Sequence, residues 1–340
     1  MHDRSAPHQV AAGVLAVLSG TPLHQAAADI GMPPADLADA IEAYQAAGTA
    51  ALHAQTSNWD WYQVRIQFPD WDSAEHIAAT HLGPHLQQAQ NTGVVAGWWF
   101  IRKAPCWRLR CRPGPATTVA DVRADMGNFL HRLTATDLID GWWENIYEAE
   151  TLAFGGPPGM HIAHELFHAD SVAILDYLRR QAAPTTHAIG RRELSILVCT
   201  ALFRAARQEW HEHADIWQRI TAMRPLPPGT ATHQIGDLTT DLFRLVTADT
   251  TPNGALFGAG GPLASAAAWA TAFNDAGHAL GKAARNGTLE RGLRDTLAHH
   301  VIFHWNRLGL PTRTQSVLAQ ATRDTVMNPP TAQPLASPGH

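Results

Sequence analysis

The segment WRLRCR, residues 107–112, alternates between apolar and basic residues. A period of two is typical of a β-strand and places Arg108, Arg110 and Arg112 on one face of it. The apolar segment GVVAGWWFI at residues 93–101 comes shortly before and predicts the partner strand. A buried guanidinium needs a carboxylate or another acceptor. The arginines therefore form either a solvated edge or the lining of a site for an anion or carbonyl group, and the spacing leaves both interpretations open.

The flanking sequence extends this strand pair into an α+β fold. WYQVRIQF at residues 61–68 also alternates, and GWWENIYEAETLAFGG at residues 141–156 predicts a strand that ends in a glycine turn. Helices are predicted at 73–89 with Ser73 as N-cap, at 164–180 and at 191–217, with further helices from Gly236, Pro262 and Gly287. We expect an antiparallel sheet packed with helices.

The first part of the chain differs from the rest. Residues 9–55 predict short helices, one of them capped by Thr21 with Pro22 at its first position. The pattern is typical of a small helix-turn-helix bundle, but the helix from Pro34 carries three acidic residues and no arginine or lysine, which DNA phosphates would repel. A structural or peptide-docking role is favoured. We expect a helical lead-in over 1–56, a catalytic domain over 57–327 and a disordered tail over 328–340.

Composition narrows the function classes. The 340 residues are 45% hydrophobic and 16% charged, with a net charge of −5. No apolar run approaches the roughly 18 residues of a membrane span, and the charge does not favour nucleic acid as a partner. Three cysteines cannot form a disulfide framework, and the polar start after Met1 shows no secretory signal. We therefore expect a cytoplasmic protein with neither a membrane nor a nucleic-acid partner.

Histidine and tryptophan are unusually common, with 20 and 12 residues. HELFH at residues 164–168 has the HExxH spacing of zinc proteases, in which His164 and His168 share a helix face and Glu165 deprotonates a metal-bound water. Glu193 is the candidate third ligand, and His161 lies nearby. A zinc hydrolase is one alternative function, although we predict no metal because the same block fits another family.

Several blocks occur in the order found in that family: WYQVRIQF, WWFIRKAPCWRLRCR, IYEAETLAFGG, FHADS, RRELSILVCTALFRAARQEWHEHADIW and FHWNRLG. On these blocks, residues 59–318 resemble the C-terminal glutamate-elimination domain of lanthipeptide dehydratases in its stand-alone form. Within that group the chain is most similar to the thiopeptide pyridine synthases. The resemblance implies a formal [4+2] cycloaddition in antibiotic biosynthesis that needs no cofactor.

Two departures from the eliminating members matter. Those domains carry H-x-R-x-R, whereas Trp107 stands here at the histidine position and Arg108 and Arg110 remain. They also carry E-x-x-R-Y-G-G, in which Ala153 and Phe154 replace the arginine and the tyrosine. The resemblance therefore implies that a glutamate-expelling site has lost a cation and gained apolar surface, which suits a large, uncharged substrate rich in rings.

The implied partner is a dehydrated precursor peptide, leader plus core, that carries azole rings and two dehydroalanines. One dehydroalanine, with its preceding amide as the iminol, supplies four atoms and the other supplies the alkene. Because ring closure joins distant residues, the main catalytic contribution is positioning. Loss of water and of the leader as its carboxamide then gives the pyridine and the macrocycle.

Catalytic roles are expected for two sets of residues. Arg108 and Arg110 would steady carbonyl or leaving hydroxyl oxygens. His168 and Asp170, two positions apart near a helix start, would shuttle protons, unless they belong to a structural network.

The block FHWNRLG, residues 303–309, matches a segment near the eliminase active site. His304 is preferred over His299 and His300 as the family histidine, while Asn306 and Arg307 are expected to contact substrate.

Further substrate contacts are expected from aromatic and hydroxyl side chains. Trp99, Trp107 and Phe154 would form a ring-accepting surface, and Ser265 and Trp269 would offer a hydroxyl and a stacking plane for an azole. An ordinary buried helix explains the last two equally well.

The site for the leader stays open between an exposed strand edge and a groove beside residues 9–55. The remaining alternative function is a non-catalytic scaffold that binds the leader and leaves the dehydrated peptide unchanged.

Overall fold

The computed structural model describes residues 7–57, 61–182, 189–230, 236 and 238–329. The chain divides into two compact units, Met1–Trp59 and Asp60–His340. The roles assigned from the sequence to a lead-in and a catalytic domain stay predictions, and most of the expected tail lies outside the described residues. Within the described part of the chain, no helix is both long enough and apolar enough to cross a membrane.

The first unit is helical, as predicted. Its described helices are α1 (Pro7–Leu18), α2 (Leu23–Asp29) and α3 (Pro34–Ser57). They share a small core of Val14, Ala26, Ala27 and Leu37. The prediction that Thr21 caps the second helix is wrong: this helix begins at Leu23, and Pro22 occupies the N-cap position with no side-chain hydrogen bond.

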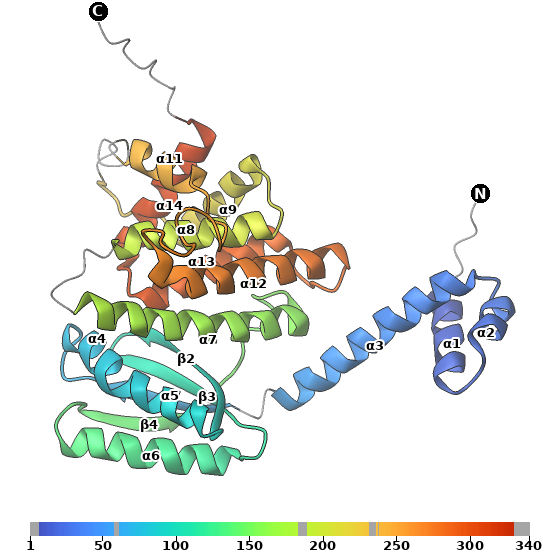
Figure 1. Ribbon diagram of the computed structural model, residues 1–340, viewed down its shortest axis with the longest axis horizontal. Helices are drawn as coiled ribbons and strands as arrows, with labels where there is room; N and C mark the ends of the chain where they lie inside the picture. The colour runs from blue at the N-terminus through green and yellow to red at the C-terminus, as the bar shows by residue number, and fades with distance from the viewer. Residues whose placement is uncertain (1–6, 58–60, 183–188, 231–235, 237, 330–340) are drawn as a thin grey trace, which may run out of the picture. The chain divides into compact units, whose positions relative to one another are not determined.

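The second unit contains the predicted antiparallel sheet (Figure 1). Its described strands are β1 (Tyr62–Gln67), β2 (Val95–Lys103), β3 (Cys106–Pro113) and β4 (Gly141–Asn145), in the order β2-β3-β1-β4. The register pairs Arg108 of β3 with Arg65 of β1 and with Ile101 of β2. Side chains alternate between the two faces of a sheet. One face, here named the arginine face, therefore carries Arg65, Arg108, Arg110 and Arg112.

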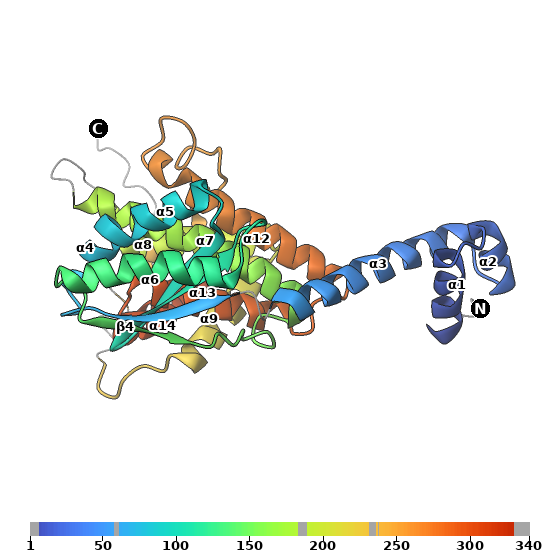
Figure 2. The same cartoon turned by 90° about the horizontal axis from the view of Figure 1, so that it is seen from below.

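The opposite face is apolar and is covered by helices. Its side chains, among them Val64, Phe100 and Leu109, join the main core together with Val122 and Met126 of α6 (Val119–Ala135). Figure 2 shows α6 running along the strands. The other helices of this layer are α4 (Ser73–Ile77) and α5 (Gly83–Asn91), joined by the π-helical turn η1 (Ala78–Leu82).

The helix predicted at 73–89 is thus interrupted by a π-helical turn. Pro84 lies in the first turn of α5, and a proline inside a helix both removes a hydrogen-bond donor and crowds the preceding turn. The wider turn accommodates it. Ser73 is the first helical residue rather than the cap, because Asp72 holds the N-cap position.

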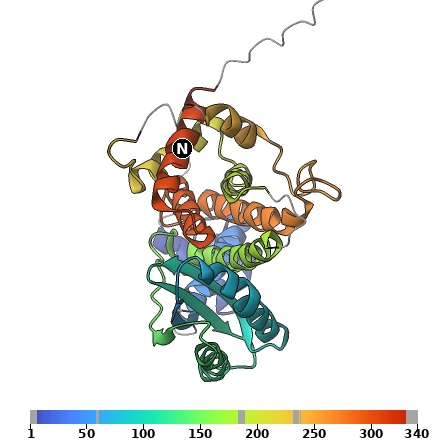
Figure 3. The same cartoon turned by 90° about the vertical axis from the view of Figure 1, so that its left-hand side faces the viewer.

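The long helix α7 (Gly156–Gln181) lies between the sheet and the C-terminal helices (Figures 1 and 3). It begins eight positions before the predicted start at residue 164. Gly155 and Gly156 have φ of 89° and 87°, and prolines follow in the first turn, where a missing N–H is harmless. The sequence Gly-Gly-Pro-Pro-Gly therefore starts a helix here instead of forming a loop.

The remaining described helices form the C-terminal half. They are α8 (Arg191–Ala205), α9 (Trp210–Met223), α11 (Thr239–Thr247), η2 (Ala264–Ala266), α12 (Ala267–Arg285), α13 (Leu293–Leu308) and α14 (Thr312–Met327). The prediction of a single helix over 191–217 is wrong, because α8 and α9 are separate helices. Arg207 adopts φ 59° between α8 and α9, and Glu209 and Glu212 form a capping box at the start of α9.

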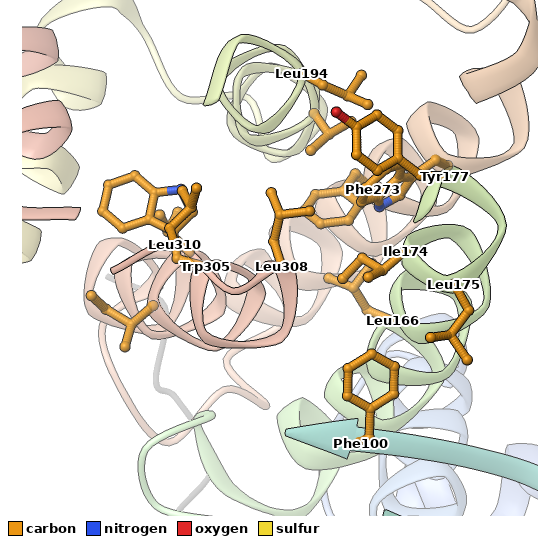
Figure 4. Packing of buried hydrophobic residues seen from close by; sticks show 14 of the residues in the cluster. Phe100, Leu166, Ile174, Leu175, Tyr177, Leu194, Phe273, Trp305, Leu308 and Leu310 are labelled. Atoms are coloured by element: carbon orange, nitrogen blue, oxygen red, sulfur yellow. The ribbon is translucent and has the colours of Figure 1, made fainter. Parts of the chain in front are cut away.

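The core joins the halves through α7. Figure 4 shows Leu166, Ile174 and Leu175 of α7 between Phe100 of β2 and the residues of the C-terminal helices, among them Phe273. The cluster is continuous from the sheet to α14, so the second unit folds around one main core.

Buried histidines make this fold sensitive to acid. Burial, with the nearby charge of Arg204, lowers the pKa of His213 to about 4, whereas the unfolded chain binds this proton near a pH of about 6.5. The folded protein therefore binds fewer protons below that pH, and the free energy of unfolding falls with the pH. When the pH is lowered from 7 to 5, the free energy of unfolding should fall by about 2 kcal/mol less in His213→Gln than in wild type. Denaturant titrations at the two pH values measure this difference.

His211, which is exposed on the same helix, gives the control. His211→Gln should keep the pH dependence of wild type. Equal slopes in His213→Gln and wild type would contradict the assignment.

Candidate functional site

The arginine face of the sheet holds more positive charge than its surroundings neutralise. Arg65 and Arg108 lie opposite each other in register, and among the described residues neither has a carboxylate partner. Arg112 Nη2 lies 3.4 Å from Glu165 Oε1, a long contact for an ion pair. The predicted one-sided row of arginines is confirmed. Arg65 was missed, although its alternation within WYQVRIQF would place it on this face once the strands are paired.

Arg110 is held rigidly within this face. Its Nε donates to Gln63 Oε1 at 2.7 Å, and its guanidinium carbon lies 4.0 Å from the ring centre of Trp99 and 4.8 Å from that of Tyr147. Burial lowers the pKa of Arg110 to about 10, so the group stays charged at neutral pH. Its Nη1 is buried and has no acceptor among the described residues. Arg110 is thus an oriented cation with donor capacity to spare.

An aromatic cluster adjoins Arg110. It consists of Trp61, Trp99, Tyr147, Phe154, Met160, Ala163 and Phe167. The rings of Trp99 and Phe167 lie 4.7 Å apart, and Phe154 lies 5.1 Å from Phe167. The predicted aromatic residues Trp99 and Phe154 are therefore brought together, although Phe154 is fully buried and packs against protein rings.

Asp170 of α7 is the centre of a buried network. Its carboxylate accepts from Trp269 Nε1 at 2.8 Å and Arg307 Nε at 2.7 Å, and lies 2.9 Å from His304 Nδ1. Burial would raise the pKa of Asp170, but His304 and Arg307 outweigh it and lower that pKa below its ordinary value. The carboxylate therefore stays ionised and joins α7 to α12 and α13.

Several buried nitrogens near this network have no hydrogen-bond partner among the described residues. They belong to Arg110, His300, His304 and Arg307, here named the polar cluster. The Arg307 guanidinium lies 4.3 Å from the Phe167 ring centre, with both Nη atoms unpaired. Burial, helped by the charge of Arg307, lowers the pKa of His300 to about 3 and keeps it neutral. Buried polar groups are nearly always paired in native proteins, so these nitrogens are candidate donors to the acceptor groups of a ligand.

Residues 61–326 match the family described as lantibiotic biosynthesis dehydratase C-term. The chain belongs to this family. The family predicted from the sequence is thus confirmed.

Solved structures share the fold of this dehydratase-family domain at low identity. The tRNA-dependent lantibiotic dehydratase MibB from Microbispora sp. 107891 is 18% identical with a TM-score of 0.56, over 78% of this chain and 28% of MibB. TsrL is 17% identical with a TM-score of 0.53, and the pyridine synthase TbtD from thiomuracin biosynthesis is 12% identical with a TM-score of 0.50. Each of these two matches covers 78% of this chain and 97% of the other. The comparison with curated proteins found no match.

The dehydratase-family fold separates His168 from Asp170, which the sequence had suggested as a pair. His168 Nδ1 lies 2.8 Å from the Trp98 carbonyl oxygen, and its Nε2 lies 3.2 Å from Gln90 Nε2. Residues two apart on a helix point in nearly opposite directions. His168 therefore contacts the outer edge of β2, whereas Asp170 contacts side chains of α13.

Other predicted substrate contacts also lie apart. Ser265 is exposed in η2, whereas Trp269 is buried against Asp170. The Asn306 amide oxygen accepts from Gln315 Nε2 at 3.0 Å and faces α14. Trp107 stacks on Phe100 on the apolar face of the sheet, because its position in β3 has the opposite parity to Arg108. The indoles of Trp107 and Trp269 and the amide of Asn306 therefore do not belong to the arginine face of this domain.

The HELFH motif of this family member does not gather its imidazoles. His164 Nε2 lies 2.8 Å from the Tyr147 hydroxyl oxygen, whereas His168 contacts the backbone of β2. Within the described ranges, no group of three or more His, Cys, Asp or Glu side chains could hold a metal ion. The two histidines thus have separate roles.

A cavity of about 380 Å³ lies between η1, α5, β2 and α7, and no residue of the arginine face lines it. Its lining includes Ala79, Trp98 and Leu175. Asp176 and Arg179 at this cavity pair with each other at 2.6 Å, so it offers apolar volume without unpaired charge.

Removal of the Asp170 charge should destabilise this family member strongly. Asp170→Asn leaves Arg307 buried without its counter-charge, and breaking a buried pair costs about 3–5 kcal/mol. Chemical denaturation should show this loss. Asp176→Asn, on the exposed side of α7, should change the free energy of unfolding by less than about 1 kcal/mol; similar losses in both variants would refute the central role of Asp170.

Proposed function

We propose that this chain is a pyridine synthase of thiopeptide biosynthesis. It joins two dehydroalanines of a precursor peptide in a formal aza-[4+2] cycloaddition and then releases water and the leader peptide. The observation that carries this proposal is the polar cluster beside the aromatic cluster. Membership of the dehydratase family and the likeness in fold to the pyridine synthase TbtD support it.

The residues present do not suit glutamate elimination. Ala153 and Phe154 stand where the eliminating pattern has arginine and tyrosine, and both pack in the aromatic cluster. The assignment of Trp107 to the histidine position is wrong: in H-x-R-x-R the histidine precedes the first arginine by two positions, which is Cys106 here, and the Trp107 ring lies on the other face of the sheet. What remains is oriented donors next to apolar rings, which suits neutral carbonyl and hydroxyl oxygens on a ring-rich peptide.

The protein would act chiefly by positioning. Arg110 would donate to an amide or hydroxyl oxygen, with Arg108 assisting from the more exposed end of the same face. His304 and Arg307, held by Asp170, would present further nitrogens from α13. As written, the bond changes need neither a metal nor a redox cofactor, because a ring forms and water and an amide leave.

The substrate would be the dehydrated, azole-bearing precursor with its leader. Three free, buried cysteines agree with a reducing cytoplasm as the place of reaction.

Incubation of the protein with a dehydrated, azole-bearing precursor tests the proposal. Mass spectrometry should detect an intact leader carboxamide together with a pyridine-containing macrocycle. Unchanged peptide, with leader binding verified, would refute the proposal and favour a non-catalytic scaffold.

Arg110→Gln should lower turnover about 100-fold or more, because it removes an oriented charged donor. Arg108→Ala should lower turnover more than it lowers the affinity for the leader. Steady-state rates measure turnover, and fluorescence anisotropy measures the affinity for the leader. Arg244→Gln is the matched control, since Arg244 is exposed and pairs with Asp241 on the surface of α11. A loss confined to leader affinity would make the arginine face a docking surface instead.

A further inference from the structure

Tyr147 and His164 form a buried hydrogen-bonded pair next to Arg110. The Tyr147 hydroxyl oxygen lies 2.8 Å from His164 Nε2. Tyr147 lies two residues after the end of β4, and His164 lies in the third turn of α7, so the pair joins two segments that are 17 positions apart. Both residues are only 8% exposed.

The surroundings of the pair are those of the aromatic cluster. Trp61 lies 4.7 Å from the His164 ring, and Trp99 lies 5.7 Å from the Tyr147 ring. The Arg110 guanidinium carbon lies 4.8 Å from the Tyr147 ring centre. The described residues place no carboxylate in hydrogen-bond contact with either side chain. The pair is therefore a neutral donor and acceptor beside a fixed cation.

Electrostatics keep both groups neutral at physiological pH. Burial raises the pKa of Tyr147, although Arg110 opposes this, and burial together with the charge of Arg112 lowers the pKa of His164 to about 3. A protonated phenol next to Arg110 can give up its proton when a stronger base develops nearby, because the guanidinium stabilises the phenolate that results.

We propose that Tyr147 is the acid–base residue of the reaction and that His164 positions its hydroxyl. This inference rests on the proposed function, since it assigns the proton transfer in that reaction. It also gives the first histidine of HELFH a role that is unrelated to metal binding.

The proton transfer belongs to the loss of water from the cycloadduct. The carbon derived from the iminol carries a hydroxyl group, and its C–O bond breaks as the Tyr147 proton moves to the leaving oxygen. The ring methylene next to the C=N carbon gives a proton to the Tyr147 phenolate, its C–H electrons form a double bond to that carbon, and the C=N π electrons shift to form N=C at the carbon that loses the hydroxyl. One water leaves and Tyr147 is restored, so atoms and charges balance.

Tyr147→Phe tests this assignment, because it keeps the ring over Arg110 and removes the hydroxyl. We expect turnover to fall about 100-fold or more, with KM for the precursor within about twofold of wild type. The cycloadduct should accumulate; it has the mass of the substrate but no longer adds thiols at the two joined dehydroalanines. A purely structural hydroxyl would not produce this intermediate.

Tyr177→Phe is the control for loss of a buried hydroxyl. Tyr177 donates to the Ile189 carbonyl oxygen at 2.8 Å, away from the arginine face, and its variant should keep wild-type turnover. If Tyr147→Phe does not fold, His164→Gln replaces it, since an amide can still hydrogen-bond to Tyr147 but fits less well; turnover should fall about 10-fold with the same intermediate.

The outcomes separate the two proposals. Wild-type protein that binds the precursor and forms no pyridine overturns the proposed function and the role of Tyr147 with it. Active wild type with an equally active Tyr147→Phe, or with losses only in precursor affinity, overturns the role of Tyr147 alone.

Discussion

The packing of α7 against α12 and α13 in the second unit depends on the buried hydrogen bonds and ion pair of the Asp170 carboxylate. This carboxylate is fully buried, and it is bound by side chains from α12 and α13. A buried charge is tolerated only when paired and hydrogen-bonded, so α7 cannot shift relative to α13 without exposing Asp170 or leaving Arg307 alone. This geometry also sets the distance between the arginine face and the nitrogens presented by α13. The contacts of Asp170 therefore fix where α13 places His304 and Arg307, two residues of the candidate site.

The two edge strands of the sheet, β2 and β4, differ in how their free backbone groups are covered. Along β2, Ser171 Oγ accepts from the Phe100 amide, and His168 contacts the Trp98 carbonyl. These side chains from α7 satisfy backbone groups that another strand would otherwise pair with. At the other edge, β4 is short and is followed by Ile146, which is 82% exposed. His168, for which a proton-shuttling role was predicted, is thus also a contact between α7 and the edge of the sheet.

The local pattern of the sequence was sufficient for the strands and for most helices. Alternation in WRLRCR identified β3 and the face of its arginines, and the strand and helix patterns of the flanking segments identified the α+β fold. The break at Arg207 was not predictable, because no glycine or proline marks it and the tertiary packing of α8 and α9 selects it. Among the candidate site residues, His304 and Arg307 were named from the family block, and the alternation in WRLRCR already places Trp107 on the face opposite Arg108, whereas the pairing of Tyr147 with His164 depends on contacts between segments. Those contacts leave no trace in local spacing.

The glycine pair before α7 limits how this site can change over time. A side chain at Gly155 would come within 2.5 Å of Leu289, and the Gly155 carbonyl accepts from the Glu290 amide at 2.8 Å. Both glycines also adopt positive φ, which other residues rarely tolerate. A side chain at either glycine would therefore strain the start of α7. The neighbouring Ala153 and Phe154 carry no such backbone requirement, so the wall of the aromatic cluster can vary there while the helix start is conserved in shape.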